Sequence, residues 1–331
     1  MKKITLLWCL TIFPIILVAQ KKRELQLFRF YVDNDYLNFR GQGTDRYYSS
    51  GAKLDFYYTK DTKQNFFDKL LIQIGENPEN LYGYGITQLI YTPSDLKNPK
   101  IIPNDRPYVG VIYLNHSLVS SDKKNKQRLI TEFDLGAIGK YAFAEETQKW
   151  LHRVINDELP AGWDNQIASD IIINYNIRFE KMIFNPAKNI EIIGLIESNT
   201  GTLSNNVGFG ITFRAGLFNN YFSNFEKLGT FVNHDYSVGN DNKKHQFYFY
   251  MKPVFSTIMD NSLLEGGFFT HNKSPHTIYK DYLNRALVNY EFGIMLGFKR
   301  FGISASEKLQ TAEYKDGPVV QTGNITFYIG L

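Results

Sequence analysis

The chain has 331 residues, of which 43% are hydrophobic and 15% aromatic, with 22 Tyr and 26 Phe. Its 37 Lys and Arg nearly balance 33 Asp and Glu, so nothing in the charge supports nucleic-acid binding. A charged fraction of 21% with many large side chains excludes a disordered chain. The slightly negative mean hydropathy argues against a bundle of membrane-spanning helices, whereas the many Tyr and Phe favour strands.

The first twenty residues predict a secretory signal. Lys2 and Lys3 precede an apolar run over residues 4–18, and a charged stretch begins at Lys21. The run is shorter than the roughly 20 residues that a spanning helix needs. We therefore expect a signal peptide over 1–20 and one mature domain over 21–331. The single cysteine, Cys9, lies inside the apolar run, so we expect a mature chain without disulfides.

Beyond the signal, apolar and polar residues alternate with a period of two. Apolar side chains occupy every second position of 52–58, 171–179, 288–298 and 325–331, with charged or amide side chains between them. About a dozen such segments are counted, an even number that can close into a barrel. They begin near Arg23, Tyr47, Tyr82, Pro107, Arg128, Gln166, Asn189, Asn206, His245, Tyr282, Phe301 and Val319.

Two fold classes explain this alternation, a soluble sandwich and a membrane barrel. Many segments are longer than the roughly five or six residues of an average strand. Aromatic pairs stand near segment ends, as interfacial girdles would require, at Tyr57-Tyr58, Phe66-Phe67, Tyr221-Phe222 and Phe268-Phe269. Lipid also demands a closed sheet. We therefore predict an all-β fold, a closed antiparallel transmembrane barrel of about 12 strands in a Gram-negative outer membrane.

Polar stretches at 122–126, 221–244 and 260–281 predict loops. The segment 142–155 instead predicts a short helix, because it is rich in helix formers. Phe143, Thr147, Trp150, Leu151 and Val154 would share one face of it. Gln148 and His152, four residues apart, lie on a neighbouring face. A helix in an exposed loop costs backbone ordering, so we expect it to cover a site.

Candidate site residues gather near the start of the mature chain. Oxygen atoms of Asn34, Asp35 and Ser49 suit calcium or magnesium, although turn chemistry explains the same residues. Among six histidines, His152 is distinguished by Gln148 on the same predicted helix. Neither Ser49 nor Ser50 lies in a Gly-x-Ser-x-Gly elbow, so spacing gives a serine triad little support.

Several motifs in a fixed order resemble the lipid A 3′-O-deacylase family of Gram-negative outer membranes. In chain order they are Asn34-Asp35, residues 44–51 (TDRYYSSG), 88–93 (QLIYTP), 105–110 (DRPYVG), Gly136 and Gly139, 148–152 (QKWLH) and 162–166 (GWDNQ). The resemblance implies a twelve-stranded barrel whose active site lies between the barrel wall and a helical loop at the outer leaflet. It also implies calcium-dependent hydrolysis of the ester-linked 3′ acyl chain of lipid A. One departure is Ser169, where many members are expected to carry an acidic residue.

The resemblance also implies roles for individual residues. His152 matches the general base that activates water, and Gln148 matches its partner on the helix. Asn34 and Asp35 match an essential Asn-Asp pair, with Asp35 expected to hold the Ca²⁺ ion and Asn34 to ligate or orient it. Ser49 matches a hydroxyl position that carries Thr or Ser in the family.

Two alternatives stay open at this point. One is a serine-nucleophile lipase or phospholipase of the same membrane, with Ser49 attacking and His152 as its base. The other is a non-catalytic barrel, either a pore or an adhesive scaffold. The expected partners are lipid A or lipopolysaccharide and outer-membrane lipids, with no nucleic acid, and the protein is expected to be monomeric.

Overall fold

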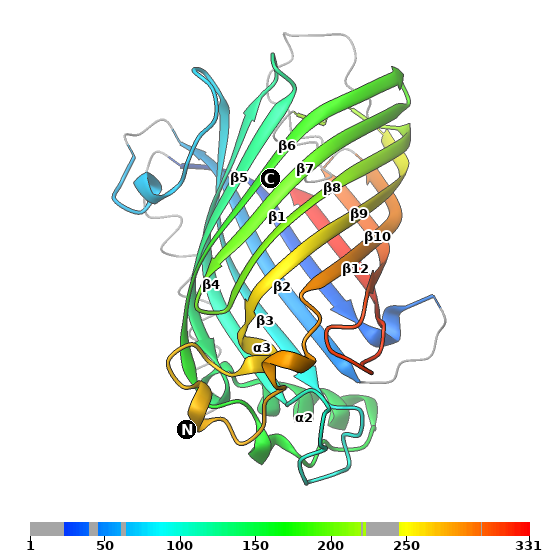
Figure 1. Ribbon diagram of the computed structural model, residues 1–331. Coiled ribbons are helices and arrows are strands. Elements are labelled where there is room, and N and C mark those ends of the chain that lie inside the picture. The colour runs from blue at the N-terminus through cyan, green and yellow to red at the C-terminus, as the bar shows by residue number, and fades with distance from the viewer. Residues whose placement is uncertain (1–22, 40–45, 61–63, 220, 223–244, 299) are drawn as a thin grey trace.

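A computed structural model describes residues 23–39, 46–60, 64–219, 221–222, 245–298 and 300–331. Twelve strands form a closed barrel in which each strand is antiparallel to its sequence neighbours, and β12 pairs back with β1 (Figure 1). The strands are β1 (Arg23–Asn34), β2 (Tyr47–Lys60), β3 (Glu79–Thr92), β4 (Val109–Asp122), β5 (Gln127–Ile138), β6 (Asp170–Ala187), β7 (Ile190–Gly201), β8 (Ser204–Leu217), β9 (His245–Asn261), β10 (Ala286–Phe298), β11 (Phe301–Gln310) and β12 (Val320–Gly330). The predicted fold is confirmed, while the predicted signal over 1–20 lies outside the described residues.

The alternation of the sequence becomes an outward and an inward face. On β6, Ile171 and Ile173 are 56% and 45% exposed on the outside, whereas Asn174 and Glu180 are buried. A protein in lipid places apolar side chains outside and polar ones in the lumen. The polar positions therefore form the interior of this barrel.

The predicted aromatic girdle is only partly right. Phe66, Phe67, Phe268 and Phe269 are exposed, at 72%, 57%, 58% and 64%. The other two pairs are buried: Tyr57 and Tyr58 at 4% and 1%, and Tyr221 and Phe222 at 7% and 0%. Their rings pack against cations, as in the stack of Arg29 over Tyr57 and of Arg128 over Tyr221. A position near the end of a strand therefore did not distinguish the exposed aromatic pairs from the buried ones.

Short helices lie in the loops and at the strand ends. They are η1 (Asp35–Leu37), η2 (Asp68–Leu70), η3 (Lys140–Ala142), α2 (Ala144–Ile155), η4 (Trp163–Asn165), α3 (Ser262–Glu265), η5 (His271–Lys273) and η6 (Lys280–Tyr282). The helix predicted over 142–155 is confirmed as α2. The loops predicted at 122–126 and 260–281 are confirmed apart from their first residues, which belong to β4 and β9. Most of the 221–244 prediction lies outside the described residues. Within the described part of the chain, no helix is long and apolar enough to cross a membrane.

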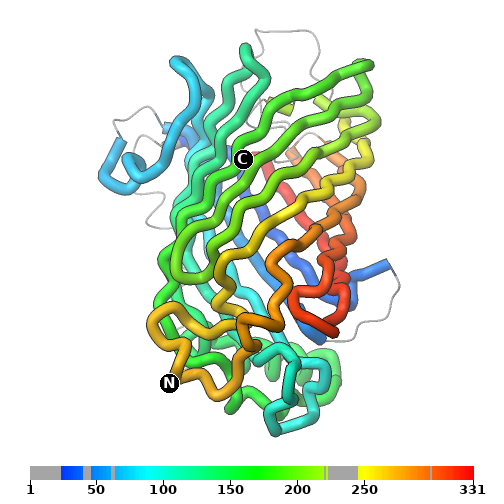
Figure 2. Tube along the Cα trace, in the orientation of Figure 1, coloured from blue at the N-terminus to red at the C-terminus, as the bar shows by residue number. Residues whose placement is uncertain are grey.

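The two ends of the barrel differ. The N-terminal end of β1 and the C-terminal end of β12 lie at the same end of the barrel, since Leu27 pairs with Gly330. Helices α2 and α3 lie at the opposite end, together with η1, as Figures 1 and 2 show. The loops that follow β1, β3, β5, β9 and β11 therefore all meet at the end that carries α2.

Candidate active site

The site begins where β1 ends. The Asn34 side chain caps η1 by accepting a hydrogen bond from the Tyr36 amide at 2.7 Å. Its Nδ2 donates to the Ser49 carbonyl at 2.8 Å. The amide of Asn34 thus fixes the start of η1 beside β2, and Asp35 follows directly.

A β-bulge at Ser49 changes which way that side chain faces. The β2–β3 register shifts between Tyr48 and Ser50. Such a bulge re-aims a side chain and leaves its residue out of the ladder, which is consistent with the Ser49 carbonyl accepting from a side chain. Ser49 is 2% exposed, and its Oγ accepts a hydrogen bond from Gln148 Nε2 at 3.2 Å.

Helix α2 lies against the outside of the barrel wall. A Cβ atom at Gly110 of β4 would come within 2.5 Å of the Ala144 Cβ, so only glycine permits this close approach. Gln88 of β3 donates through Nε2 to the Ala142 carbonyl at 2.7 Å. Leu114 shares a face of β4 with Gly110 and is 47% exposed on the lipid side. The contact face of α2 is therefore the outer face of the wall.

The side of α2 that meets the wall is its polar one. Ala144, Gln148 and His152, each four residues from the next, are its buried residues. Gln148 Oε1 accepts a hydrogen bond from Trp163 Nε1 at 2.9 Å. Trp163 is 1% exposed and packs against Tyr108 with a ring separation of 4.9 Å. Gln148 is thereby held so that its Nε2 points toward Ser49.

His152 is fixed by the turn that ends α2. The helix closes at Asn156 in the left-handed conformation, and the Asp157 amide bonds back to the His152 carbonyl at 2.8 Å. The His152 Nδ1 is hydrogen-bonded to the Glu158 carbonyl. A carbonyl only accepts, so this bond places the proton of a neutral ring on Nδ1 and its lone pair on Nε2. Tyr36 donates to Asp157 at 3.2 Å and ties this turn to η1.

The structure brings the predicted site residues to one end of the barrel. Asn34, Ser49 and Gln148 are joined by the hydrogen bonds above, and His152 lies one turn along α2 from Gln148. Asp35 is 3% exposed at the base of η1, where its carbonyl accepts from Asn38 Nδ2 at 2.5 Å. The Oγ of Ser169 accepts a hydrogen bond from the Lys140 amide at 3.1 Å.

The donor set here is compatible with a hard cation. Asp35, Asn34 and Ser49 offer carboxylate, amide and hydroxyl oxygens, which calcium accepts together with backbone and water oxygens. Among the described residues, no group of three or more His, Cys, Asp and Glu gathers to hold a metal. A calcium ion at this site would therefore rely on few carboxylates.

The comparisons place the chain in a family. A family model described as outer membrane protein LpxR matches residues 4–331. The chain belongs to the LpxR family. LpxR from Salmonella typhimurium has a similar fold, with a TM-score of 0.70 at 19% identity over 92% of this chain and 100% of that one. The β-domain of the Bordetella autotransporter BrkA has a TM-score of 0.46 at 6% identity, covering 93% and 99%. No curated protein matches the chain.

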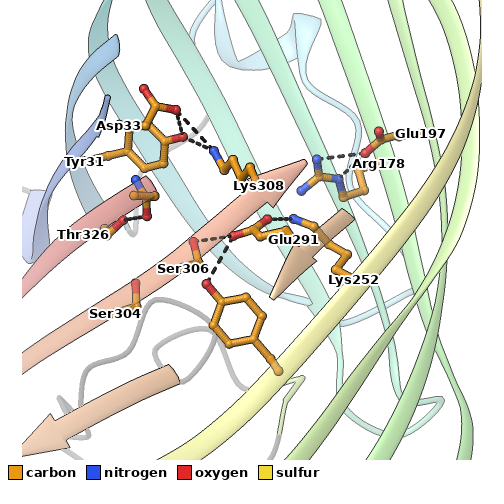
Figure 3. Close-up of polar contacts among 12 residues, drawn as sticks. Tyr31, Asp33, Arg178, Glu197, Lys252, Glu291, Ser304, Ser306, Lys308 and Thr326 are labelled. Atoms are coloured by element: carbon orange, nitrogen blue, oxygen red, sulfur yellow. Dashed lines mark hydrogen bonds and ion pairs between the residues drawn. The ribbon is translucent and has the colours of Figure 1, made fainter. Parts of the chain in front are cut away.

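In this LpxR-family barrel the lumen is a separate compartment. Asp33 precedes Asn34 on β1, so its side chain points to the opposite side of the wall. A cavity of about 320 Å³ lies inside, lined by Asp33 and by ion-paired residues of several strands. Figure 3 shows the charge pairs, which are Lys308–Asp33 at 3.3 Å, Lys252–Glu291 at 2.5 Å and Arg178–Glu197 at 2.8 Å. Cations and anions neutralise each other there, and the candidate residues face away from it.

Asp105 and Arg106 connect several loops of this LpxR-family protein, and their place in a sequence motif did not reveal this role. Asp105 Oδ1 accepts from the Tyr314 hydroxyl at 3.1 Å, and the Asp105 carbonyl bonds to His276 Nε2 at 2.6 Å. Burial first, and then the nearby Asp105 carboxylate, raise the pKa of Tyr314, so the phenol keeps its proton. Arg106 pairs with Glu313 at 2.9 Å. Residues 105–110 form one of the motifs of the sequence, but one sequence could not show which loops Asp105 and Arg106 join.

Proposed function

We propose that the protein is an outer-membrane esterase that removes the 3′-linked acyl or acyloxyacyl chain of lipid A by calcium-dependent hydrolysis. Membership of the LpxR family and the barrel fold support the location and the substrate class. The observation that carries the proposal is the buried polar face of α2, set against the outer wall beside Ser49 and Asn34. This face lies between α2 and the outer surface of the wall, on the side of the barrel that membrane lipids contact, and not in the lumen.

His152 acts as the general base in this proposal. Its Nδ1–H bond to the Glu158 carbonyl orients the ring and leaves the basic electron pair on Nε2. Imidazole titrates near neutral pH and is therefore suited to take a proton from water as that water attacks an ester carbonyl. Proton transfer of this kind contributes about 10²–10⁴-fold to a rate.

Asp35 and Asn34 would hold the calcium ion, with Ser49 ligating it or binding substrate. When bound, the ion would stabilise the negative charge that develops on the carbonyl oxygen. Gln148 holds the Ser49 hydroxyl in place through the 3.2 Å bond. An amide N–H donates and cannot remove a proton, so Gln148 does not activate Ser49 as a nucleophile.

The test is hydrolysis of purified lipid A by the detergent-solubilised protein, followed by mass spectrometry. Chelation is expected to abolish the loss of fatty-acid mass, and added Ca²⁺ to restore it. A serine-directed covalent probe is expected to leave Ser49 unlabelled. Unchanged hydrolysis under chelation, together with a covalent adduct on Ser49, would instead show a serine lipase and overturn the proposed mechanism.

A further inference from the structure

The two sides of the barrel wall come together at the bulge of β2. Tyr48 lines the cavity in the lumen, whereas Ser49, the next residue, is bonded to Gln148 of α2 on the outside. The register shift between Tyr48 and Ser50 makes this change of side possible, because an extra residue in one strand re-aims the side chains beside it. A contact that fixes Tyr48 in the lumen therefore also bears on the direction of Ser49.

Tyr48 is held in the lumen by Asp33. Its hydroxyl donates a hydrogen bond to Asp33 Oδ1 at 2.5 Å, and Asp33 lies opposite Gly51 in the β1–β2 register. A Cβ atom at Gly51 would collide with both the Tyr48 hydroxyl oxygen and Asp33 Oδ1, so only glycine leaves room for this bond. The Tyr48 side chain thus reaches across Gly51 and spans residues 49 and 50, which form the bulge.

The other oxygen of Asp33 is occupied as well. Asp33 Oδ2 accepts hydrogen bonds from the Tyr31 hydroxyl and from Lys308 Nζ, the latter at 3.3 Å, as Figure 3 shows. Asp33 is 4% exposed. Hydrogen bonds to an ionised carboxylate are stronger than those between neutral groups. Because both of its oxygens are bound, Asp33 offers Tyr48 an acceptor of fixed orientation.

Strand β1 holds the same bulge from the outer side. Asn34 follows Asp33, so its side chain points to the opposite face of the wall. Its Nδ2 donates to the Ser49 carbonyl at 2.8 Å, and Asn34 pairs with Ser50 in the register. Two neighbouring side chains of β1 therefore fix the bulge, one from each side of the wall.

We propose that Asp33 and Tyr48 are positioning residues, which act from the lumen to direct the Ser49 side chain toward α2. The inference rests on the proposed function, because Ser49 belongs to its site, and it gives the lumenal charge cluster a part in that function. Both side chains lie on the lumenal side of the wall, so they act on hydrolysis only through the bulge. Without the Tyr48–Asp33 bond the bulge relaxes, and Ser49 no longer stays within reach of Gln148.

The first test compares Tyr48→Phe with Tyr31→Phe as the matched control. Each variant removes one phenol that donates to Asp33, but only Tyr48 belongs to the strand that carries Ser49. Tyr31 also accepts from Lys308, so the control disturbs the lumen at least as much. We expect kcat for lipid A to fall several-fold in Tyr48→Phe and to change little in Tyr31→Phe. Equal kcat values in the two variants would overturn the proposal.

The second test measures the direction of residue 49 without hydrolysis. The predicted mature chain has no cysteine, so Ser49→Cys introduces a single thiol at a position that is 2% exposed. We expect a water-soluble maleimide to label this thiol slowly in the folded, detergent-solubilised barrel. Labelling should become several-fold faster when Tyr48→Phe is added and stay slow when Tyr31→Phe is added. Equal labelling rates in the three proteins would overturn the proposal.

Gly51→Ala breaks the same hydrogen bond while Tyr48 is retained, because the new methyl group occupies the path between the hydroxyl and Asp33. Added to Ser49→Cys, it should speed labelling as Tyr48→Phe does, and slow labelling would count against the proposal. The thiol readout also separates the two proposals. Wild-type protein that releases no acyl chain would refute the proposed function, whereas the labelling rates would still show whether the lumenal bond directs residue 49.

Discussion

Trp163 donates a hydrogen bond from Nε1 to Oε1 of Gln148 at 2.9 Å, and both side chains are buried. The amide of Gln148 has a carbonyl end and an amino end. Because Trp163 can only donate, it fixes the carbonyl toward itself and the amino group toward Ser49. Trp163 is thus a positioning residue for the candidate site.

Trp163→Phe keeps a ring against Tyr108 but removes the donor. A hydrogen bond contributes only about 0.5–1.5 kcal/mol net to stability, so we expect little change in the unfolding temperature. Because Gln148 is no longer oriented toward Ser49, we expect kcat to fall several-fold. Trp150→Phe, which changes an exposed Trp of α2, is the control for detergent-solubilised enzyme. An equal loss of kcat in both variants would show that the loss does not come from the orientation of Gln148.

Gly110→Ala is expected to displace α2 from the wall. The new methyl group would lie 2.5 Å from the Ala144 Cβ, closer than two carbons can approach. Hydrolysis should fall at least tenfold while the barrel still resists unfolding in detergent. The double variant Gly110→Ala with Ala144→Gly should recover most of the activity, since the two changes exchange one methyl group. If the double variant did not recover activity, the close approach of α2 to the wall would not be the reason why Gly110 is needed.

Arg106→Met is expected to destabilise the loops at the end that carries α2. Arg106 is 2% exposed, and its removal leaves the Glu313 carboxylate without its cation. Removing one partner of a buried ion pair lowers the free energy of unfolding by about 3–5 kcal/mol. The double variant Arg106→Met with Glu313→Gln should be less destabilised than Arg106→Met alone. Protease sensitivity of 262–285 and 311–319 measures the effect, and additive losses would contradict the pairing.

At the other end of the barrel, Asp68 gives a pH-dependent contact. Burial acts to raise the pKa of Asp68, but hydrogen bonds from Lys60, the Asn65 amide and His116 outweigh it and lower the pKa below its ordinary value. Because the pKa of Asp68 is lower in the folded state than in the unfolded chain, its ionised carboxylate stabilises the fold above the unfolded pKa of about 3.9. This stabilisation is lost as the pH falls from there through the folded pKa. Hydrogen exchange of 64–71 should rise below about pH 4. Asp68→Asn should remove this pH dependence.

Strand positions were predictable because the two faces of each strand meet different solvents. Expected starts at Arg23, Tyr47, His245 and Phe301 are the observed ones. The largest differences occur where loops with their own short helices precede the strand, as before Asp170 and Ala286. The local pattern there does not mark where pairing begins, because the neighbouring strand decides it.

The helix of the site was predictable, but its environment was not. The face holding Trp150 and Val154 was found from spacing, and nothing in one sequence shows that this face points away from the barrel. The bulge at Ser49 and the Trp163–Gln148 bond join segments distant in sequence, so periodicity carries no sign of them. The calcium dependence, the residue roles, the cleaved signal and the monomeric state stay predictions.

The most direct test of the central claim is mass spectrometry of lipid A treated with wild-type protein and with His152→Ala, each confirmed as a folded barrel. The wild type should remove the mass of the 3′ chain, and the variant should do so at least about 100-fold more slowly, in keeping with the loss of a general base. Equal removal by both proteins would show that His152 of α2 is not the base.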